Sequence, residues 1–207
     1  MIESNKNTVF EKMFSVYNKH ILKKHFSALY LKGQENFINR NKNIPTLIYA
    51  NHSNWWDGLI AFYLSYNLWK SNAFIMMDYK QMKKYFFFKW IGAFSVDKES
   101  VIDSYRSFKY AAELMKVNTN VLWLFPQGVM LPNDLRPIKF EKGLSKLIEI
   151  SGNINLLPLV FNYEFLSEQR PEAFIEILPA VNFDLNNSSY QMTEILEMIL
   201  SEALNSQ

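Results

Sequence analysis

The residues of this sequence best suited to acid–base chemistry are His52 and Asp57. His52 follows the run at 46–51 (TLIYAN), which predicts a buried strand. Asp57 comes five residues after His52, where a helix is expected to begin. An Asp there can cap the helix. It can equally turn back onto the imidazole, fix its tautomer and stabilise the cation formed when His52 takes a proton from an alcohol. A structural histidine beside a capping aspartate is the alternative.

Other catalytic groups are scarce. His20 and His25 lie in a lysine-rich segment and predict solvated side chains, and the chain has no Cys, which excludes thiolate nucleophiles and disulfides. Ser53 adjoins His52 without the Gly-x-Ser-x-Gly turn of a serine hydrolase. One His near one Asp falls short of a metal ligand set, so we expect no metal site. Direct attack by a deprotonated acceptor on an acyl donor is the simplest use of the pair.

The composition indicates a folded protein that is rich in aromatic side chains. The 207 residues suit one domain and include 17 Phe, 11 Tyr and 5 Trp, an aromatic content typical of a rich core or of a surface that is half wet and half apolar. A net charge of +2 is too small to indicate nucleic-acid binding. No apolar run approaches the roughly 20 residues that span a bilayer, and no signal segment is evident. We therefore expect a cytoplasmic protein, peripheral on the inner face of the cell membrane.

The first 40 residues are expected to form an amphipathic helical segment, followed by a catalytic domain over 41–207. Apolar residues recur at helical spacing within 8–31, and lysines occupy much of the opposite side. The apolar positions are Phe10, Met13, Phe14, Tyr17 and Ile21. Such a helix either packs on the core or lies in the lipid interface with its lysines near anionic headgroups.

The rest of the chain alternates between expected strands and expected helices. Strands are predicted at 46–51, 73–77, 93–96, 121–125, 155–160 and 173–178, and helices at 57–69, 79–90, 99–116, 142–151 and 188–205. This pattern predicts an α/β fold with a mixed, largely parallel sheet flanked by helices. Chemistry in such sheets gathers beyond the strand ends. The segments NHSNWWD and PQG both follow predicted strands.

Five blocks in order resemble the glycerolipid acyltransferases, the family of 1-acylglycerol-3-phosphate acyltransferases. Residues 51–57 (NHSNWWD) resemble the N-H-x4-D motif, and 92–98 (GAFSVDK) resemble the second block. Residues 125–128 (FPQG) are similar to F-P-E-G, and 140–143 (FEKG) to F-x-x-G. Residues 157–159 (LPL) resemble the V-P-V strand. Together the blocks span about residues 45–180.

The resemblance implies that His52 is the base for an acceptor hydroxyl and that Asp57 orients it. The donor would be acyl-CoA or an acyl carrier protein thioester, used as co-substrate without a further cofactor. Backbone N–H groups near Gly128 are candidates for holding the oxyanion, and their alternative role is to make a turn. The candidate substrate-binding residues are Asn51, Lys98, Phe125, Pro126, Gln127, Gly128, Arg136 and Lys139.

Departures from the family pattern bear on the acceptor. Gln127 replaces the Glu of F-P-E-G-T-R and Met130 replaces its Arg, which the family associates with the acceptor's phosphate. Lys98 stands where Arg is common, and Arg136 and Lys139 could compensate. We therefore expect a non-phosphorylated lipid alcohol or glycolipid as acceptor. The alternatives are a 1-acylglycerol-3-phosphate acyltransferase of phospholipid synthesis, a thioester or lipid hydrolase, and a non-catalytic lipid-binding protein.

Overall fold

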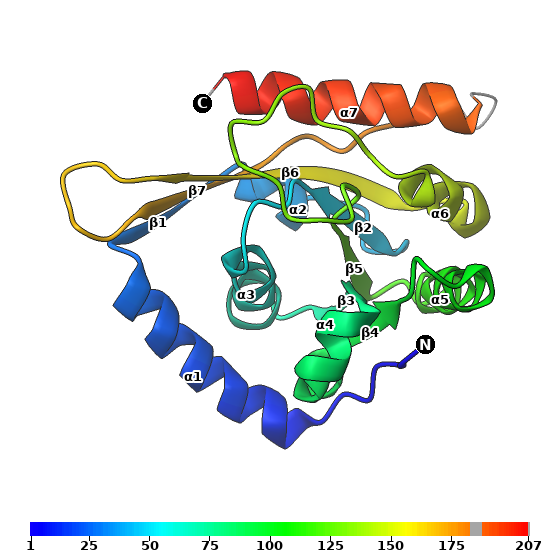
Figure 1. Cartoon of the computed structure of the whole chain (residues 1–207), viewed down its shortest axis with the longest axis horizontal. Coiled ribbons are helices and arrows are strands. Elements are labelled where there is room, and N and C mark those ends of the chain that lie inside the picture. Colours follow the sequence, from blue (N-terminus) through cyan, green and yellow to red (C-terminus); the bar gives the residue numbers. More distant parts are fainter. Residues whose placement is uncertain (183–187, 207) are drawn as a thin grey trace.

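A seven-stranded sheet in the order β1-β7-β6-β2-β5-β3-β4 forms the centre of the protein (Figure 1). The computed structural model describes residues 1–182 and 188–206. The strands are β1 (Ala28–Lys32), β2 (Thr46–Ala50), β3 (Asn72–Asp78), β4 (Ala93–Val96), β5 (Asn120–Leu124), β6 (Asn155–Glu164) and β7 (Glu172–Ile177). From β6 to β4 all neighbours are parallel, whereas β7 runs antiparallel to β6 and parallel to β1. The expected mixed, largely parallel sheet is confirmed.

Helices cover both faces of this sheet. They are α1 (Thr8–His25), α2 (Gln34–Ile38), α3 (Trp56–Phe62), α4 (Tyr79–Lys84), α5 (Val101–Leu114), α6 (Gly143–Ser151) and α7 (Ser189–Asn205), with a π-helix η1 (Tyr63–Leu68) and a 3-10 helix η2 (Phe86–Ile91). Figure 1 shows α7 above the sheet, α6 and α5 at its right-hand side, and α3 and α1 below it. Alternate β2 side chains follow this division, because Tyr49 packs with α6 and α7 and Ile48 packs with α3. Both faces of β2 are fully buried.

The segment joining α1 to the sheet differs from the prediction. The helix expected over 8–31 ends at His25, and Ala28–Lys32 form β1. β1 pairs with β7 along its whole length, and Ser27 N–H donates to the Pro171 carbonyl at 3.0 Å. The helical spacing of apolar residues predicted a helix here, but hydrogen bonding to the distant strand β7 makes this segment a strand. The expected connection at 33–45 also contains α2, whose Phe37 enters the core.

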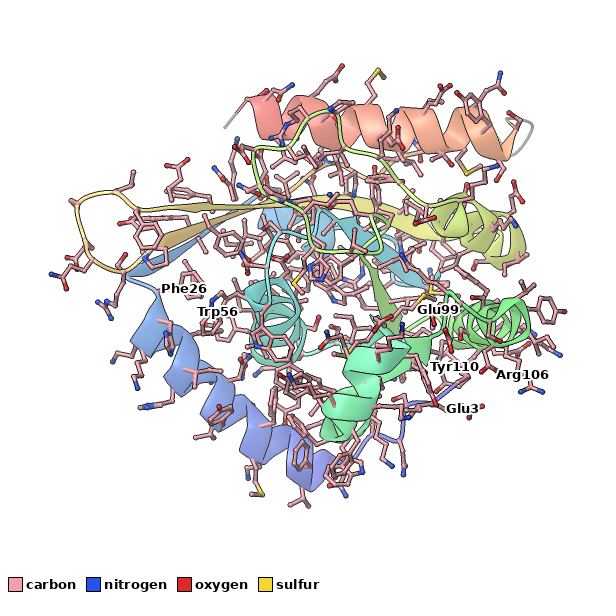
Figure 2. All side chains as sticks on the ribbon, viewed as in Figure 1. Glu3, Phe26, Trp56, Glu99, Arg106 and Tyr110 are labelled. Carbon is pink, nitrogen blue, oxygen red and sulfur yellow. The ribbon has the colours of Figure 1, made fainter. Side chains whose placement is uncertain are left out.

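α1 packs on the core through a face that includes polar residues. Of the apolar positions, Phe14 is buried, whereas Met13 is 65% exposed and Tyr17 is also exposed. Asn18 is fully buried, and its side-chain amide donates to the Leu59 carbonyl at 2.9 Å. At the C-terminal end of α1 the Phe26 ring meets Trp56 of α3 edge-on, as Figure 2 shows. The helix therefore lies against α3 and turns an apolar stripe outward.

Candidate active site

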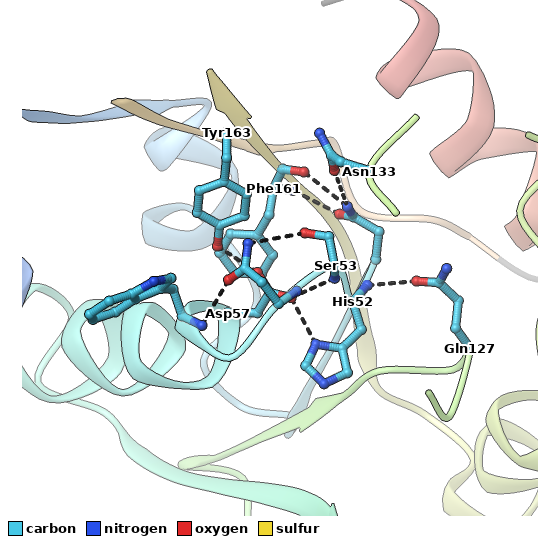
Figure 3. A network of polar contacts seen from close by, with 10 residues as sticks. His52, Ser53, Asp57, Gln127, Asn133, Phe161 and Tyr163 are labelled. Carbon is cyan, nitrogen blue, oxygen red and sulfur yellow. Dashed lines mark hydrogen bonds and ion pairs between the residues drawn. The ribbon is translucent and has the colours of Figure 1, made fainter. Parts of the chain in front are cut away.

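His52 and Asp57 are in direct contact at the start of α3 (Figure 3). The Nδ1 of His52 lies 2.7 Å from Oδ2 of Asp57. Because a carboxylate only accepts hydrogen bonds, Nδ1 carries the proton. The same Oδ2 accepts from the backbone N–H groups of Ser53 at 2.7 Å and Asn54 at 3.1 Å. One carboxylate therefore fixes both the loop backbone and the imidazole. The N-cap position of α3 is Trp55, which has no side-chain cap, so Asp57 orients the imidazole and does not cap the helix.

Tyr163 supplies a further hydrogen bond that sequence reasoning missed. Its hydroxyl, on β6, donates to Oδ1 of Asp57. Burial, followed by the charge of Asp57 and this hydrogen bond, raises the pKa of Tyr163 well above its ordinary value. The ring lies between Phe26 and Phe161. No local spacing links Tyr163 to Asp57, because only the pairing of β2 with β6 brings them together.

The free edge of the His52 ring faces a cavity. The ring stacks on Phe125, with centroids 4.4 Å apart, and the side chain is 22% exposed. Among the described residues none forms a hydrogen bond with Nε2. His52 and Phe125 both line the cavity. The imidazole is thus held from one side and open on the other, as a general base requires.

Gln127 holds the His52 loop. Its Oε1 accepts from the His52 backbone N–H at 2.6 Å, while the Leu131 N–H donates to the His52 carbonyl at 2.9 Å. Gln127 is buried. An amide oxygen performs this bridging as well as a carboxylate would, so the exchange of Glu for Gln removes a charge without removing the contact. The structure places Gln127 behind the loop, where it accepts a hydrogen bond from backbone and does not line the cavity.

Lys98 lies directly across the backbone of Gly128. Gly128 has a φ of +68°, and a Cβ placed there would be 1.9 Å from the Lys98 ammonium. Lys98 lines the cavity and pairs with Glu141 at 3.6 Å. The Gly128 N–H donates to the Phe125 carbonyl at 3.0 Å, so it closes a turn. The Gly128 N–H is therefore used in the turn. An oxyanion-binding role for the other backbone N–H groups near Gly128 stays a prediction.

Asn51, Arg136 and Lys139, which were also predicted to bind substrate, make contacts within the protein. Both ends of the Asn51 amide bond the main chain of Phe161, at 2.9 and 2.8 Å, and fasten β2 to β6. Arg136 donates to the Asn133 carbonyl at 2.8 Å and to the Asn205 side chain at 3.0 Å. Lys139 pairs with Glu197 of α7 at 3.0 Å.

Arg136 and Lys139 are therefore not brought beside the free edge of His52. Neither is among the described residues that line the large cavity. Phe125 and Pro126 do line it, as does Gly128, so the strand-end block after β5 contributes to the site as the sequence indicates. The expected compensation for the lost Arg by Arg136 and Lys139 has no support in this geometry.

The cavity is large and mainly apolar. Its volume is about 1340 Å³, above the range of roughly 300–1,000 Å³ usual for small-molecule sites. From His52 it extends past side chains of α3, β3 and α5. Residues typical of its walls are Trp55, Leu59, Phe62, Ile75, Phe88 and Phe108. This space fits long aliphatic chains better than a compact polar ligand.

Comparison with known proteins settles the family. Residues 28–162 match a sequence model of the family described as Acyltransferase. The chain belongs to the acyltransferase family. The structure of this acyltransferase is similar to the crystal structure of the 1-acyl-sn-glycerophosphate (LPA) acyltransferase PlsC from Thermotoga maritima, with a TM-score of 0.68 and 17% sequence identity. The match covers 95% of this chain and 79% of that chain, and confirms the fold. No curated protein sequence matches the chain significantly.

The family assignment makes the protein an enzyme that transfers acyl groups. In this acyltransferase the matched region contains both His52 and Asp57 but ends one residue before Tyr163. Across the described part of the chain, no helix combines the length and the apolar character needed to cross a bilayer.

Proposed function

We propose that this acyltransferase moves a fatty acyl group from a thioester donor, acyl-CoA or acyl carrier protein, to a hydroxyl of a lipid acceptor at the membrane surface. The observation that carries the proposal is the His52–Asp57 pair at 2.7 Å beside an apolar cavity of about 1340 Å³. Acid–base chemistry needs the pair, and long-chain substrates need the space.

The reaction follows from the position of the imidazole. Nε2 of His52 takes the hydroxyl proton while the acceptor oxygen attacks the thioester carbonyl, and a C–O bond forms. The resulting tetrahedral oxyanion collapses, the C–S bond breaks, and the thiolate leaves with the proton returned by His52. Asp57, buried and holding Nδ1, stabilises the transient imidazolium. No covalent enzyme intermediate is needed.

The acceptor is a lipid alcohol without a phosphate, such as a glycolipid. A phosphate dianion calls for fixed cationic partners. Met130 supplies none, and Arg136 and Lys139 contact the loop and α7. Lys98 lines the cavity but already faces Glu141 at 3.6 Å. Lys98 is also the observation that favours the second candidate, a phosphorylated acceptor such as that named for the Thermotoga maritima protein.

α1 supports binding to a membrane surface, and we propose the inner face of the cell membrane as that surface. Its outward stripe consists of the exposed apolar residues Val9, Met13, Val16 and Tyr17. Lysines flank this stripe and continue to the end of the helix at Lys23 and Lys24. An apolar stripe with a basic margin suits an anionic lipid interface.

The catalytic part is tested by His52→Ala with one acyl-CoA and a panel of acceptors. Loss of the base should lower kcat by about 10²- to 10⁴-fold. His20→Ala, the same exchange at an exposed position of α1, should retain full activity. Acyl transfer by His52→Ala at the wild-type rate would remove the proposed role. Product analysis separates transfer from hydrolysis, because a hydrolase would release free fatty acid whether or not an alcohol is present.

The acceptor part is tested with lysophosphatidic acid, glycerol 3-phosphate, a glycolipid and a long-chain alcohol. Neutral lipid alcohols should give the higher kcat/KM. Equal or better use of lysophosphatidic acid would contradict the assignment and favour the phosphorylated acceptor. In that case Lys98→Gln should raise KM for lysophosphatidic acid while leaving kcat/KM for the neutral alcohol nearly unchanged.

A further inference from the structure

The cavity beside His52 reaches both faces of the sheet. Successive side chains of a strand point to opposite faces. Ala73 and Ile75 of β3 pack with the α3 side of the core, while Phe74 and Met76 pack with the side covered by α5, α6 and α7. All four line the same cavity. The cavity therefore has two arms, which we call the α3 arm and the α5–α6 arm.

The arms meet because β3 and β5 part near the site. Their ladder ends at the pair Ile75 and Trp123, but β3 continues to pair with β4 as far as Asp78. The next β5 residue, Leu124, pairs with Tyr49 of β2 on its other side. Because β2, β3 and β5 are parallel, this parting lies at the same end of the sheet as His52, which follows β2.

The α3 arm ends among buried side chains. It is lined by Gly58, Ala61 and Ser65 from α3 and η1, and by Trp123 from β5. The last three are almost fully buried, and the Trp123 indole N–H donates to the Ser65 hydroxyl at 2.8 Å. An arm walled by buried side chains limits the length of chain that it can take, which suits the acyl chain of the donor.

The α5–α6 arm is an open groove with an apolar floor and rim. Phe74, Ala112 and Leu144 line its floor. Val101 and Tyr105, at its α5 edge, are 85% and 69% exposed. Exposed apolar side chains around an apolar groove fit an aliphatic chain that arrives from a lipid phase.

The charges along this groove argue that it does not bind the phosphate-bearing part of the donor, which is CoA or the acyl carrier protein. Four lysines and four carboxylates line the cavity as a whole: Lys98, Lys109, Lys142, Lys146, Asp78, Glu113, Glu141 and Glu149. Equal numbers leave no net positive charge to hold a phosphate. The apolar floor is then the main source of affinity.

We propose that the α5–α6 arm binds an aliphatic chain of the acceptor lipid while the α3 arm holds the acyl chain of the donor. This inference rests on the proposed function, and adds that the acceptor is itself a chain-bearing lipid. Direct transfer brings both substrates to His52 at once, so two chains need separate space. The cavity supplies that space on opposite faces of one sheet.

Two leucine substitutions at helical positions test the arms separately. Ala112→Leu extends into the α5–α6 arm. Gly58→Leu extends into the α3 arm, where a Cβ on Gly58 would be 3.9 Å from Ile75 Cδ1, an ordinary contact. Each variant is assayed with acceptors of one headgroup and increasing chain length, and then with donors of increasing acyl length. Thermal unfolding checks that each variant is folded; Ala112→Met and Gly58→Ala are the milder replacements.

Ala112→Leu should lower kcat/KM for long-chain acceptors by about tenfold relative to short-chain ones, the effect typical of small changes in apolar volume. Its donor-length profile should match that of the wild type, and Gly58→Leu should show the reverse. A shift in the donor profile of Ala112→Leu, or no shift in its acceptor profile, would overturn the assignment. If wild-type enzyme transfers acyl groups to no lipid, the proposed function itself fails, which is a separate outcome.

Discussion

Asp57 is the most heavily engaged side chain of the site, because a single buried carboxylate accepts four hydrogen bonds. They come from the His52 ring, two backbone N–H groups and the Tyr163 hydroxyl. Such a network fixes the position of the carboxylate and disperses its charge. Tyr163 does not contact the reacting atoms, so it acts as a positioning residue through Asp57.

Tyr163→Phe removes this one hydroxyl and keeps the ring. The expected loss of stability is about 1.5–3 kcal/mol, typical of a hydrogen bond to a charged group. We expect kcat to fall roughly tenfold, or about 1.4 kcal/mol of barrier. With fewer donors, more of the Asp57 charge acts on the imidazolium, so the acid limb of the kcat/KM profile should move to higher pH. The substitution does not alter Lys98 and Glu141, the other charged groups named near the site, so the expected shift is assigned to the lost hydroxyl.

Tyr49→Phe is the matched control for Tyr163→Phe. Tyr49 is also buried, but among the described residues its hydroxyl has no hydrogen-bond partner. Its removal should leave kcat and the pH profile unchanged. An unshifted acid limb in Tyr163→Phe, together with wild-type kcat, would show that the hydroxyl contributes only to packing.

Contacts in the site could be predicted from the sequence where the two residues are close together in the chain. His52 and Asp57 are five residues apart on one loop, so spacing was enough to bring them together. Tyr163 lies 106 residues from Asp57, and no periodicity in either segment reports the pairing of β2 with β6. Arg136 was expected near the site because it is close in sequence, but its guanidinium bonds the loop and Asn205.

At the scale of elements, the outward stripe of α1 should determine membrane binding. Met13→Glu with Val16→Glu places two carboxylates on it and should abolish most binding to anionic liposomes in a sedimentation assay. Turnover on a dispersed acceptor should change little, because neither residue lines the cavity. Deleting α1 is a poorer test, since Phe14 and Leu22 are buried in the core.

A charge at another exposed apolar site controls for solubility effects. Val117→Glu lies between α5 and β5, away from α1, and should leave liposome binding unchanged. Equal binding by the α1 double variant and the wild type would contradict membrane binding through this helix.

Strands could be predicted from the sequence where all of their residues are buried. The apolar run at 46–51 could be recognised as β2 because both of its faces are buried. β1 was missed because its burial is partial and its strand character depends on the distant β7. The sequence also left open which face of α1 packs on the core. Its helical period was clear, but Asn18 turns inward to bond Leu59, and no pattern of apolar residues signals a buried amide.

At the scale of the whole molecule, buried tyrosines should make the fold sensitive to alkaline pH. Burial raises the pKa of both Tyr49 and Tyr163 above 10, since the phenolate is poorly solvated in the core. In the unfolded chain both titrate near about pH 10. The unfolded state therefore releases protons that the folded state retains. Stability is complete below pH 10 and is lost as the pH rises toward the folded values.

Urea unfolding between roughly pH 9 and pH 12 measures this loss. Each buried tyrosine should contribute a slope of about 1.4 kcal/mol per pH unit above pH 10. Tyr49→Phe should remove one tyrosine's contribution to the alkaline slope. It should not lower the free energy of unfolding at neutral pH, because the Tyr49 hydroxyl has no partner among the described residues. Tyr163→Phe should remove the other tyrosine's contribution to the slope. This variant should also be less stable at pH 7, because Asp57 loses a hydrogen-bond donor. Identical alkaline slopes in wild type and both variants would place the sensitivity elsewhere.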